Sequence, residues 1–186
     1  MDKFDERSVG RGLAPAASAP NVLPKRKHPR LKHYDYAQGG YYHVVISTKN
    51  NQPILSTVGR GYASTAVEVT LTDIGQECKE QLFALETRYS TVKIDQYMIM
   101  PTHIHVMIAM DGGTAGASPR PTLSQVIGTF KSLTTRICNQ KDNVQGRVIF
   151  QTSFYDTVIR NHQDYLATWQ YIQTNPYGWE QQEELK

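Results

Sequence analysis

The chain has 186 residues, of which 39% are hydrophobic, with a net charge of +3 and a sequence pI of about 8.8. This length favours one domain with tails over two domains, and two widely separated cysteines argue against a disulfide framework and for a reducing compartment. No apolar run approaches membrane-spanning length and residues 1–7 lack a hydrophobic signal region, so we expect a cytoplasmic protein without a membrane partner.

The first part of the chain has the composition of a tail. Residues 8–24 are rich in Gly, Ala, Ser and Pro and show no periodicity, which is typical of disorder. A basic run follows, with Lys25, Arg26, Lys27, Arg30 and Lys32 as its charged members. It is either a solvated leader or an arm that lies along phosphates, and the sequence leaves both open. We expect the folded domain to begin near Tyr34.

The middle of the chain predicts strands around one helix. Residues 41–48 are aromatic and β-branched and predict a strand, and residues 66–71 predict a short second one. Thr72 can cap the helix that follows. Its apolar stripe consists of Ile74, Cys78, Leu82, Leu85 and Tyr89. Two further strands are expected at residues 91–100 and 103–110, with Pro101 and Thr102 forming either a kink or a tight turn between them.

The second half predicts a loop, two helices and a strand region. Residues 111–121 predict a flexible loop, after which Thr122 and Gln125 form a capping-box pattern. In the helix that follows, Lys131 and Arg136 fall away from the apolar stripe and should face solvent. That stripe is Leu123, Val126, Ile127, Phe130, Leu133 and Ile137. Residues 148–150 and 154–159 predict strand.

A last helix is expected from about Gln163 to Thr174, and Pro176 should stop it because the residue before a proline is pushed out of the helical region. With the short strand at 66–71 and the last helix left aside, and with residues 148–159 counted as one strand region, the order of elements is βαββαβ. We therefore predict an α+β fold with a ferredoxin-like antiparallel sheet, helices on one face, and an additional C-terminal helix.

Two histidines one residue apart occupy the predicted strand at 103–110. Side chains at i and i+2 of a strand point to the same side, so His103 and His105 should stand together and could hold one ion. Imidazoles within an apolar strand cost desolvation free energy unless a partner compensates it. The alternative is that one histidine packs and the other faces solvent, and so short a pattern does not decide between the two.

The last helix presents two different faces on a helical wheel. The core face should hold Tyr165, Leu166, Trp169 and Ile172, whereas Asp164, Thr168, Tyr171 and Asn175 fall on another side. Tyr171 and Asn175 are four residues apart, so their side chains can meet. Tyr171 is either a half-exposed tyrosine at a helix end or a nucleophile, with Asn175 as an oxygen donor to a metal. A divalent cation would help a phenol, which is a poor nucleophile at neutral pH, to attack a phosphodiester.

Several segments resemble a known family. Residues 100–106, Met-Pro-Thr-His-Ile-His-Val, resemble the histidine-hydrophobe-histidine (HUH) motif of single-tyrosine transposases. Residues 154–161, then Asp164-Tyr165, then residues 171–176, are similar to the C-terminal signature of the REP-associated tyrosine transposases, which act at repetitive extragenic palindromes in bacterial genomes. Residues 30–36, 40–42 and 129–132 also resemble that branch. The resemblance spans roughly residues 30–179, and the joint order and spacing of the motifs are specific.

The resemblance implies a bacterial, nucleoid-associated enzyme that cleaves single-stranded or hairpin DNA and transfers the strand through a covalent 5′-phosphotyrosine intermediate. It implies that Tyr171 is the nucleophile, that His103 and His105 bind Mg²⁺ or Mn²⁺, and that Asn175 is a third ligand. It implies a monomer or a homodimer. Candidate phosphate contacts, assigned by charge and position, are Lys25, Arg26, Lys27, Arg30, Lys32, Lys131, Arg136 and Arg160. We divide the chain into a disordered basic tail at 1–29, the transposase domain at 30–180 and a C-terminal tail at 181–186.

Two other functions compete with this one. A domesticated, non-catalytic nucleic-acid-binding module of the same fold could stack bases on Tyr41, Tyr42 or Tyr97, and it would have no need of the histidine pair. A metal-dependent hydrolase could use an H-x-H strand and an activated water. Barrel hydrolases with that motif need far more chain than 186 residues, which disfavours the hydrolase.

Overall fold

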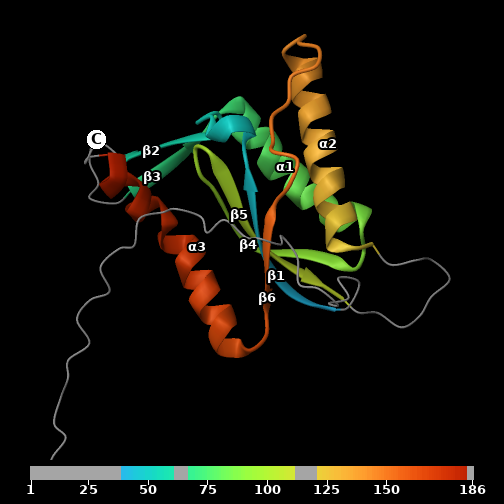
Figure 1. Ribbon diagram of the computed structural model, residues 1–186, viewed down its shortest axis with the longest axis vertical. Coiled ribbons are helices and arrows are strands. Elements are labelled where there is room, and N and C mark those ends of the chain that lie inside the picture. The colour runs from blue at the N-terminus through green and yellow to red at the C-terminus, as the bar shows by residue number, and fades with distance from the viewer. Residues whose placement is uncertain (1–38, 61–66, 112–120, 184–186) are drawn as a thin grey trace, which may run out of the picture.

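The computed structural model describes residues 39–60, 67–111 and 121–183, with side chains through Trp179 (Figure 1). The elements in chain order are β1 (Gly40–Ser47), a short 3-10 turn (Lys49–Asn51), β2 (Ser56–Arg60), β3 (Val67–Leu71), α1 (Asp73–Arg88), β4 (Val92–Ile99), β5 (His103–Met110), α2 (Leu123–Lys141), β6 (Tyr155–Ile159) and α3 (His162–Glu183). The predicted tail, the basic run and most of the predicted loop at 111–121 lie outside the described residues. No helix in the described part is long and apolar enough to cross a membrane.

Four strands form an antiparallel sheet in the order β4-β5-β1-β6. When the β2–β3 hairpin is set aside, β1, α1, β4, β5, α2 and β6 follow one another in the βαββαβ order of a ferredoxin-like domain. The strands lie between α3 on one side and α1 with α2 on the other (Figure 1). The predicted fold class is confirmed.

Strict alternation along β1 and β5 gives the sheet two different faces. Every second residue packs into the core beneath α1 and α2; these residues are Tyr42, Val44, Ile46, Ile104, Val106 and Ile108. The intervening side chains point to the opposite face, because successive strand residues alternate. His43 and Val45 of β1 and His103 and His105 of β5 therefore lie on the face that α3 covers.

Pro101 and Thr102 form a tight turn that joins β4 to β5. Ile99 pairs with Ile104, and the Met100 N–H donates to the His103 carbonyl at 2.8 Å. The turn is also bound from outside, because the backbone N–H of Thr48 donates to the Thr102 carbonyl at 2.9 Å. This settles the choice between a kink and a turn, and it fixes where β5 and its histidines begin.

Sequence patterns missed β2, and with it the pairing of β2 with β3. The predicted strand at 66–71 exists as β3, but it pairs with β2 in a separate two-stranded sheet. β2 has only one buried residue, Ser56, so it shows no apolar alternation. The prediction of a strand at 148–150 was wrong, because the pairing of this segment is limited to an isolated bridge between Thr48 and Phe150.

Helix α3 was predicted incorrectly at its end and at two of its four expected core residues. It continues through Pro176 to Glu183, whereas Pro176 was expected to stop it. The ring removes one backbone donor and crowds the carbonyl four residues earlier, but Pro176 is buried where α3 meets β3 and β4, and this packing opposes that cost. Leu166 and Trp169, expected in the core, are 53% and 37% exposed. Ile172 is fully buried, as expected, and α3 also buries a polar residue, Asn175.

Lys131 does not face solvent as predicted. Its Nζ donates to the carbonyl oxygens of Gln151, Thr152 and Ser153 at 2.9, 3.3 and 2.8 Å. An ammonium has three donors, so these bonds use all of them. Lys131 therefore holds the segment that leads into β6, and its predicted phosphate contact would require these bonds to break.

Gly75 of α1 lies against the backbone before β2. A Cβ there would be 1.9 Å from the Leu55 carbonyl oxygen, and Leu55 is fully buried. We expect Gly75→Ala to lower the free energy of unfolding by about 2 kcal/mol, because the overlap involves backbone that has no room to move. Gly128→Ala in α2, where nothing lies within 4 Å, should raise it by about 0.5–1 kcal/mol through helix propensity. Urea unfolding followed by circular dichroism measures both, and equal stability of the two variants would contradict the close approach.

Candidate active site

Three histidines form one cluster on the sheet face beneath α3. His105 is central: its Nε2 lies 3.0 Å from His103 Nε2, and its Nδ1 lies 3.1 Å from His43 Nε2. The rings of His43 and His105 stack with centroids 5.3 Å apart, and His103 meets His105 edge-on at 4.7 Å. The strand pleat therefore brings the predicted pair together, and β1 adds a third imidazole.

Burial keeps these imidazoles uncharged. His103 and His105 are only 8% and 1% exposed, which excludes the alternative in which one of them faces solvent. Burial lowers the pKa of His43 and of His103 from 6.5 to about 4. It lowers the pKa of His105 well below 6.5, and the neighbouring His103 and His43 add to that effect. At neutral pH each ring is neutral and keeps one nitrogen lone pair for a metal or a hydrogen bond.

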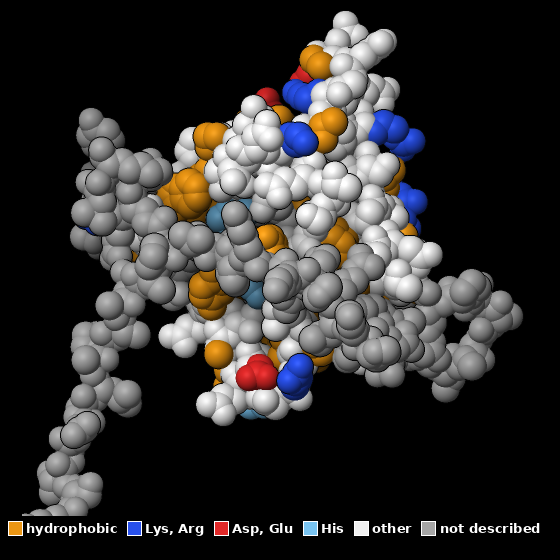
Figure 2. Space-filling model, viewed as in Figure 1, with side chains coloured by type: hydrophobic (Ala, Val, Ile, Leu, Met, Phe, Trp, Pro, Cys, Tyr) orange, Lys and Arg blue, Asp and Glu red, His pale blue; other side chains and the backbone are white. Residues whose placement is uncertain are grey.

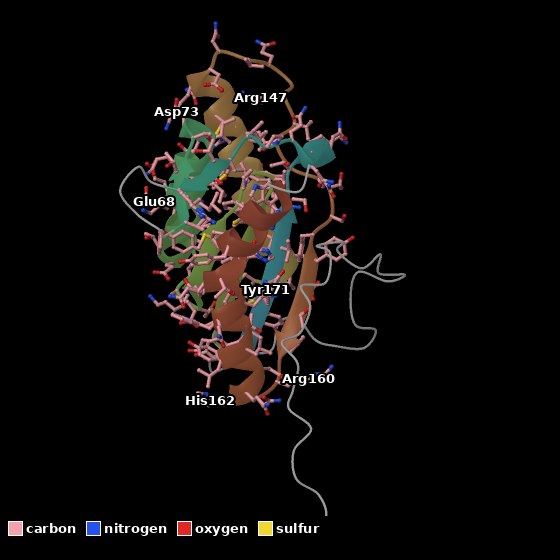
Figure 3. All side chains as sticks on the ribbon, turned by 90° about the vertical axis from the view of Figure 1, so that its left-hand side faces the viewer. Glu68, Asp73, Arg147, Arg160, His162 and Tyr171 are labelled. Atoms are coloured by element: carbon pink, nitrogen blue, oxygen red, sulfur yellow. The ribbon has the colours of Figure 1, made fainter. Side chains whose placement is uncertain are left out.

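Helix α3 brings Tyr171 and Trp179 to the same cluster, since the Trp179 ring lies 6.0 Å from that of His103, and Asn175 lies between these two residues on the same side of the helix. The Tyr171 ring lies 5.3 Å from that of His105 and 6.1 Å from that of His43, in edge-to-face contacts. Tyr171 lies midway along α3 (Figure 3) and is 43% exposed, so a substrate can reach it. Asn175, one turn further, is 8% exposed, and its Oδ1 has no hydrogen-bond partner among the described residues.

The chemistry of these donors fits a divalent cation. A buried amide oxygen without a partner costs free energy, and a ligated metal would remove that cost. His103 and His105 supply neutral nitrogens, and Asn175 supplies an oxygen. In the described ranges no group of three or more His, Cys, Asp or Glu side chains is arranged to hold a metal. The candidate set is therefore mixed, with two imidazoles and one amide.

Tyr165 anchors the first half of α3 to the sheet. Its ring contacts Tyr41 of β1 edge-on at 5.3 Å. Its hydroxyl hydrogen-bonds the carboxylate of Asp95, which raises the pKa of Tyr165 to about 12. Asp95 lies at a register shift in β4, between Ile94 and Gln96. These contacts set the position of α3, and hence of Tyr171, over the histidines.

The predicted phosphate contacts do not gather into one patch within the described residues. Arg160 is exposed between β6 and α3 (Figure 3), and Arg136 is exposed on α2. Lys and Arg side chains visible in Figure 2 lie mainly along α2. The five basic residues of the N-terminal run, Lys25, Arg26, Lys27, Arg30 and Lys32, lie outside the described residues.

The tyrosines proposed to stack bases are only partly available for that role. Tyr42 is fully buried in the core, so the expectation that it could stack a base was wrong. Tyr97 packs edge-on against Phe83 with centroids 5.4 Å apart. Tyr41 is 41% exposed but already contacts Tyr165.

Sequence reasoning missed His43. The sequence could have indicated His43 through strand alternation: in the predicted strand at 41–48, His43 alternates with the buried Tyr42 and Val44, so it lies on the same face as Val45. Its contact with His105 crosses 62 positions of sequence, and only the pairing of β1 with β5 reveals it.

Comparisons with known proteins identify the family and support the fold. A family profile described as "Transposase IS200 like" matches residues 36–175. A protein of unassigned role from Haemophilus influenzae is 28% identical over 171 residues, covering 84% of this chain and 91% of its own. The solved structure of a REP-associated tyrosine transposase bound to a REP hairpin is similar with a TM-score of 0.53 and 20% identity. The match covers 80% of this chain and 73% of that one, and it supports a shared fold.

Proposed function

The chain belongs to the IS200-like transposase family, and we propose that it cleaves single-stranded DNA at hairpin sequences and transfers the strand through a covalent bond to Tyr171. The observation that carries the proposal is the accessible phenol of Tyr171 beside a buried histidine, with its ring 5.3 Å from that of His105. A tyrosine with a purely structural role would have no need of a neutral imidazole pair beneath it.

His103, His105 and Asn175 would hold a Mg²⁺ or Mn²⁺ ion, since the mixed nitrogen and oxygen set leaves room for further oxygen ligands. Such a cation, when bound, polarises a phosphodiester and stabilises charge on its oxygens. The protein's own part is to keep the imidazoles neutral by burial and to hold Tyr171 over them through the Tyr165 anchor.

Cleavage would begin with attack of the Tyr171 Oη on phosphorus. The Oη–P bond forms and the P–O3′ bond breaks, so the upstream strand leaves with a 3′-hydroxyl and the phenol proton balances the one that this hydroxyl gains. The downstream strand stays attached through its 5′-phosphate. An incoming 3′-hydroxyl reverses the step and releases the phenol. No water is consumed, so the energy of the phosphodiester is kept for strand transfer.

Hairpin DNA is the proposed substrate. The similar solved structure holds a REP hairpin, and the net charge of +3 suits a polyanion. Arg160, exposed beside the start of α3, is the described basic residue that we assign to phosphate binding. Acting on such DNA, the protein would work at the nucleoid of a bacterial cell.

A denaturing gel tests the proposal. The full chain is mixed with labelled single-stranded hairpin DNA from the region that flanks its own gene, with Mn²⁺ or with EDTA. We expect a protein-linked DNA band that survives denaturation and is lost with EDTA. DNA binding without that band would favour the non-catalytic binding module, and absence of both would overturn the assignment to DNA.

A further inference from the structure

We propose that His43 is a positioning residue that fixes the tautomer of His105, so that His105 turns its Nε2 lone pair toward the metal. The inference rests on the proposed function, because it concerns the same metal site. It assigns a role to His43, which lies on β1 and belongs neither to the H-x-H pattern nor to α3.

The two ring nitrogens of His105 have different partners. Nδ1 has His43 Nε2 at 3.1 Å, and Nε2 has His103 Nε2 at 3.0 Å. A neutral imidazole carries one N–H and one lone pair. When Nδ1 carries the proton, it donates to His43, and the Nε2 lone pair is left facing His103.

His103 follows the same arrangement with a different acceptor. Its Nδ1 lies 3.0 Å from the hydroxyl oxygen of Thr102, which can accept the N–H, and its Nε2 faces His105. Thr102 belongs to the tight turn before β5, and His43 belongs to the neighbouring strand. The two acceptors thus allow both protons to sit on Nδ1 when a cation, rather than a shared proton, occupies the gap between the two Nε2 atoms. Metal-binding histidines commonly donate their other N–H in this way.

Packing alone is the competing explanation for His43. Its ring stacks on His105 at 5.3 Å and contacts the edge of Tyr171 at 6.1 Å, so it also supports both by contact. Two substitutions distinguish the packing role of His43 from its role as a hydrogen-bond acceptor. His43→Phe keeps an aromatic ring but removes the acceptor. His43→Gln removes the ring but supplies an amide oxygen at about the reach of Nε2.

The test measures Mn²⁺ binding to the full chain without DNA, from the electron paramagnetic resonance signal of the free ion. We expect His43→Phe to weaken Mn²⁺ affinity by about 10–100-fold, the usual effect of losing such an acceptor. His43→Gln should recover affinity to within a few-fold of the unsubstituted protein. Affinity unchanged in His43→Phe, or equally weak in both variants, would overturn the proposal.

A second measurement needs no substitution, so it tests the proposal even if a variant fails to fold. Nitrogen-15 NMR of the histidine side chains in the unsubstituted, metal-free protein should find the His105 proton on Nδ1, and a proton on Nε2 would overturn the inference. If the unsubstituted chain does not bind Mn²⁺, or if His103→Ala leaves binding unchanged, then the proposed metal site fails. That outcome differs from failure of the His43 role, in which the unsubstituted chain binds Mn²⁺ and His43→Phe does not weaken the binding.

Discussion

Tyr171→Phe is expected to abolish the covalent protein–DNA adduct, with a loss of more than about 1,000-fold, as is usual when a nucleophile is removed. The substitution removes a single oxygen and keeps the ring that contacts His105 and His43. Hairpin binding should therefore stay within about threefold of the unsubstituted protein. The adduct is measured on denaturing gels, and binding is measured by fluorescence anisotropy with the same DNA.

Tyr177→Phe is the matched control. Tyr177 lies on the same helix and is 48% exposed, but it lines a separate cavity of about 650 Å³ with residues of β3 and β4. It should form the adduct normally. An adduct that persists in Tyr171→Phe, or that is lost equally in Tyr177→Phe, would contradict the assignment of the nucleophile.

His103→Ala should remove metal-dependent cleavage by at least about 100-fold while leaving the fold in place. The imidazole is the first side chain of β5, and the backbone of the turn that positions it is held by Met100 and Thr48, whose bonds survive the substitution. Cleavage is measured at several Mn²⁺ concentrations, and thermal unfolding is measured alongside.

His162→Ala provides the comparison for His103→Ala. His162 is exposed at the start of α3 (Figure 3), where its ring stacks on Tyr165 and lies apart from the histidine cluster. We expect nearly normal cleavage in this variant. If His103→Ala cleaves DNA as well as His162→Ala does, then the metal lies elsewhere.

Local signals predicted much of this fold. Thr72 accepts from the Gly75 N–H, and Thr122 with Gln125 forms a complete capping box, so both helix starts were readable from the sequence. β5 begins at the residue where the histidine pattern begins. β2 could not be read, because a two-stranded hairpin with one buried residue has no apolar periodicity.

The site was predictable only as separate pieces. The pleat of a strand dictates that His103 and His105 share a side, and helical spacing dictates that Tyr171 and Asn175 are neighbours. The core face of α3 was predicted correctly at Ile172 and at the half-buried Tyr165 but wrongly at Leu166 and Trp169, because apolar residues were assumed to face inward. The surface that α3 covers carries histidines, and α3 buries the amide of Asn175 one turn after Tyr171, which contacts them. A contact between polar faces of this kind depends on tertiary pairing, which periodicity does not report.

The most direct test of the central claim is to locate the DNA on the protein. The adduct formed with Mn²⁺ and hairpin DNA is digested with a protease and a nuclease, and the peptide that carries the residual nucleotide is sequenced by mass spectrometry. We predict a 5′-phosphate ester on Tyr171. Attachment to any other residue, such as Tyr165 or Tyr177, or the recovery of unmodified peptide alone, would contradict it.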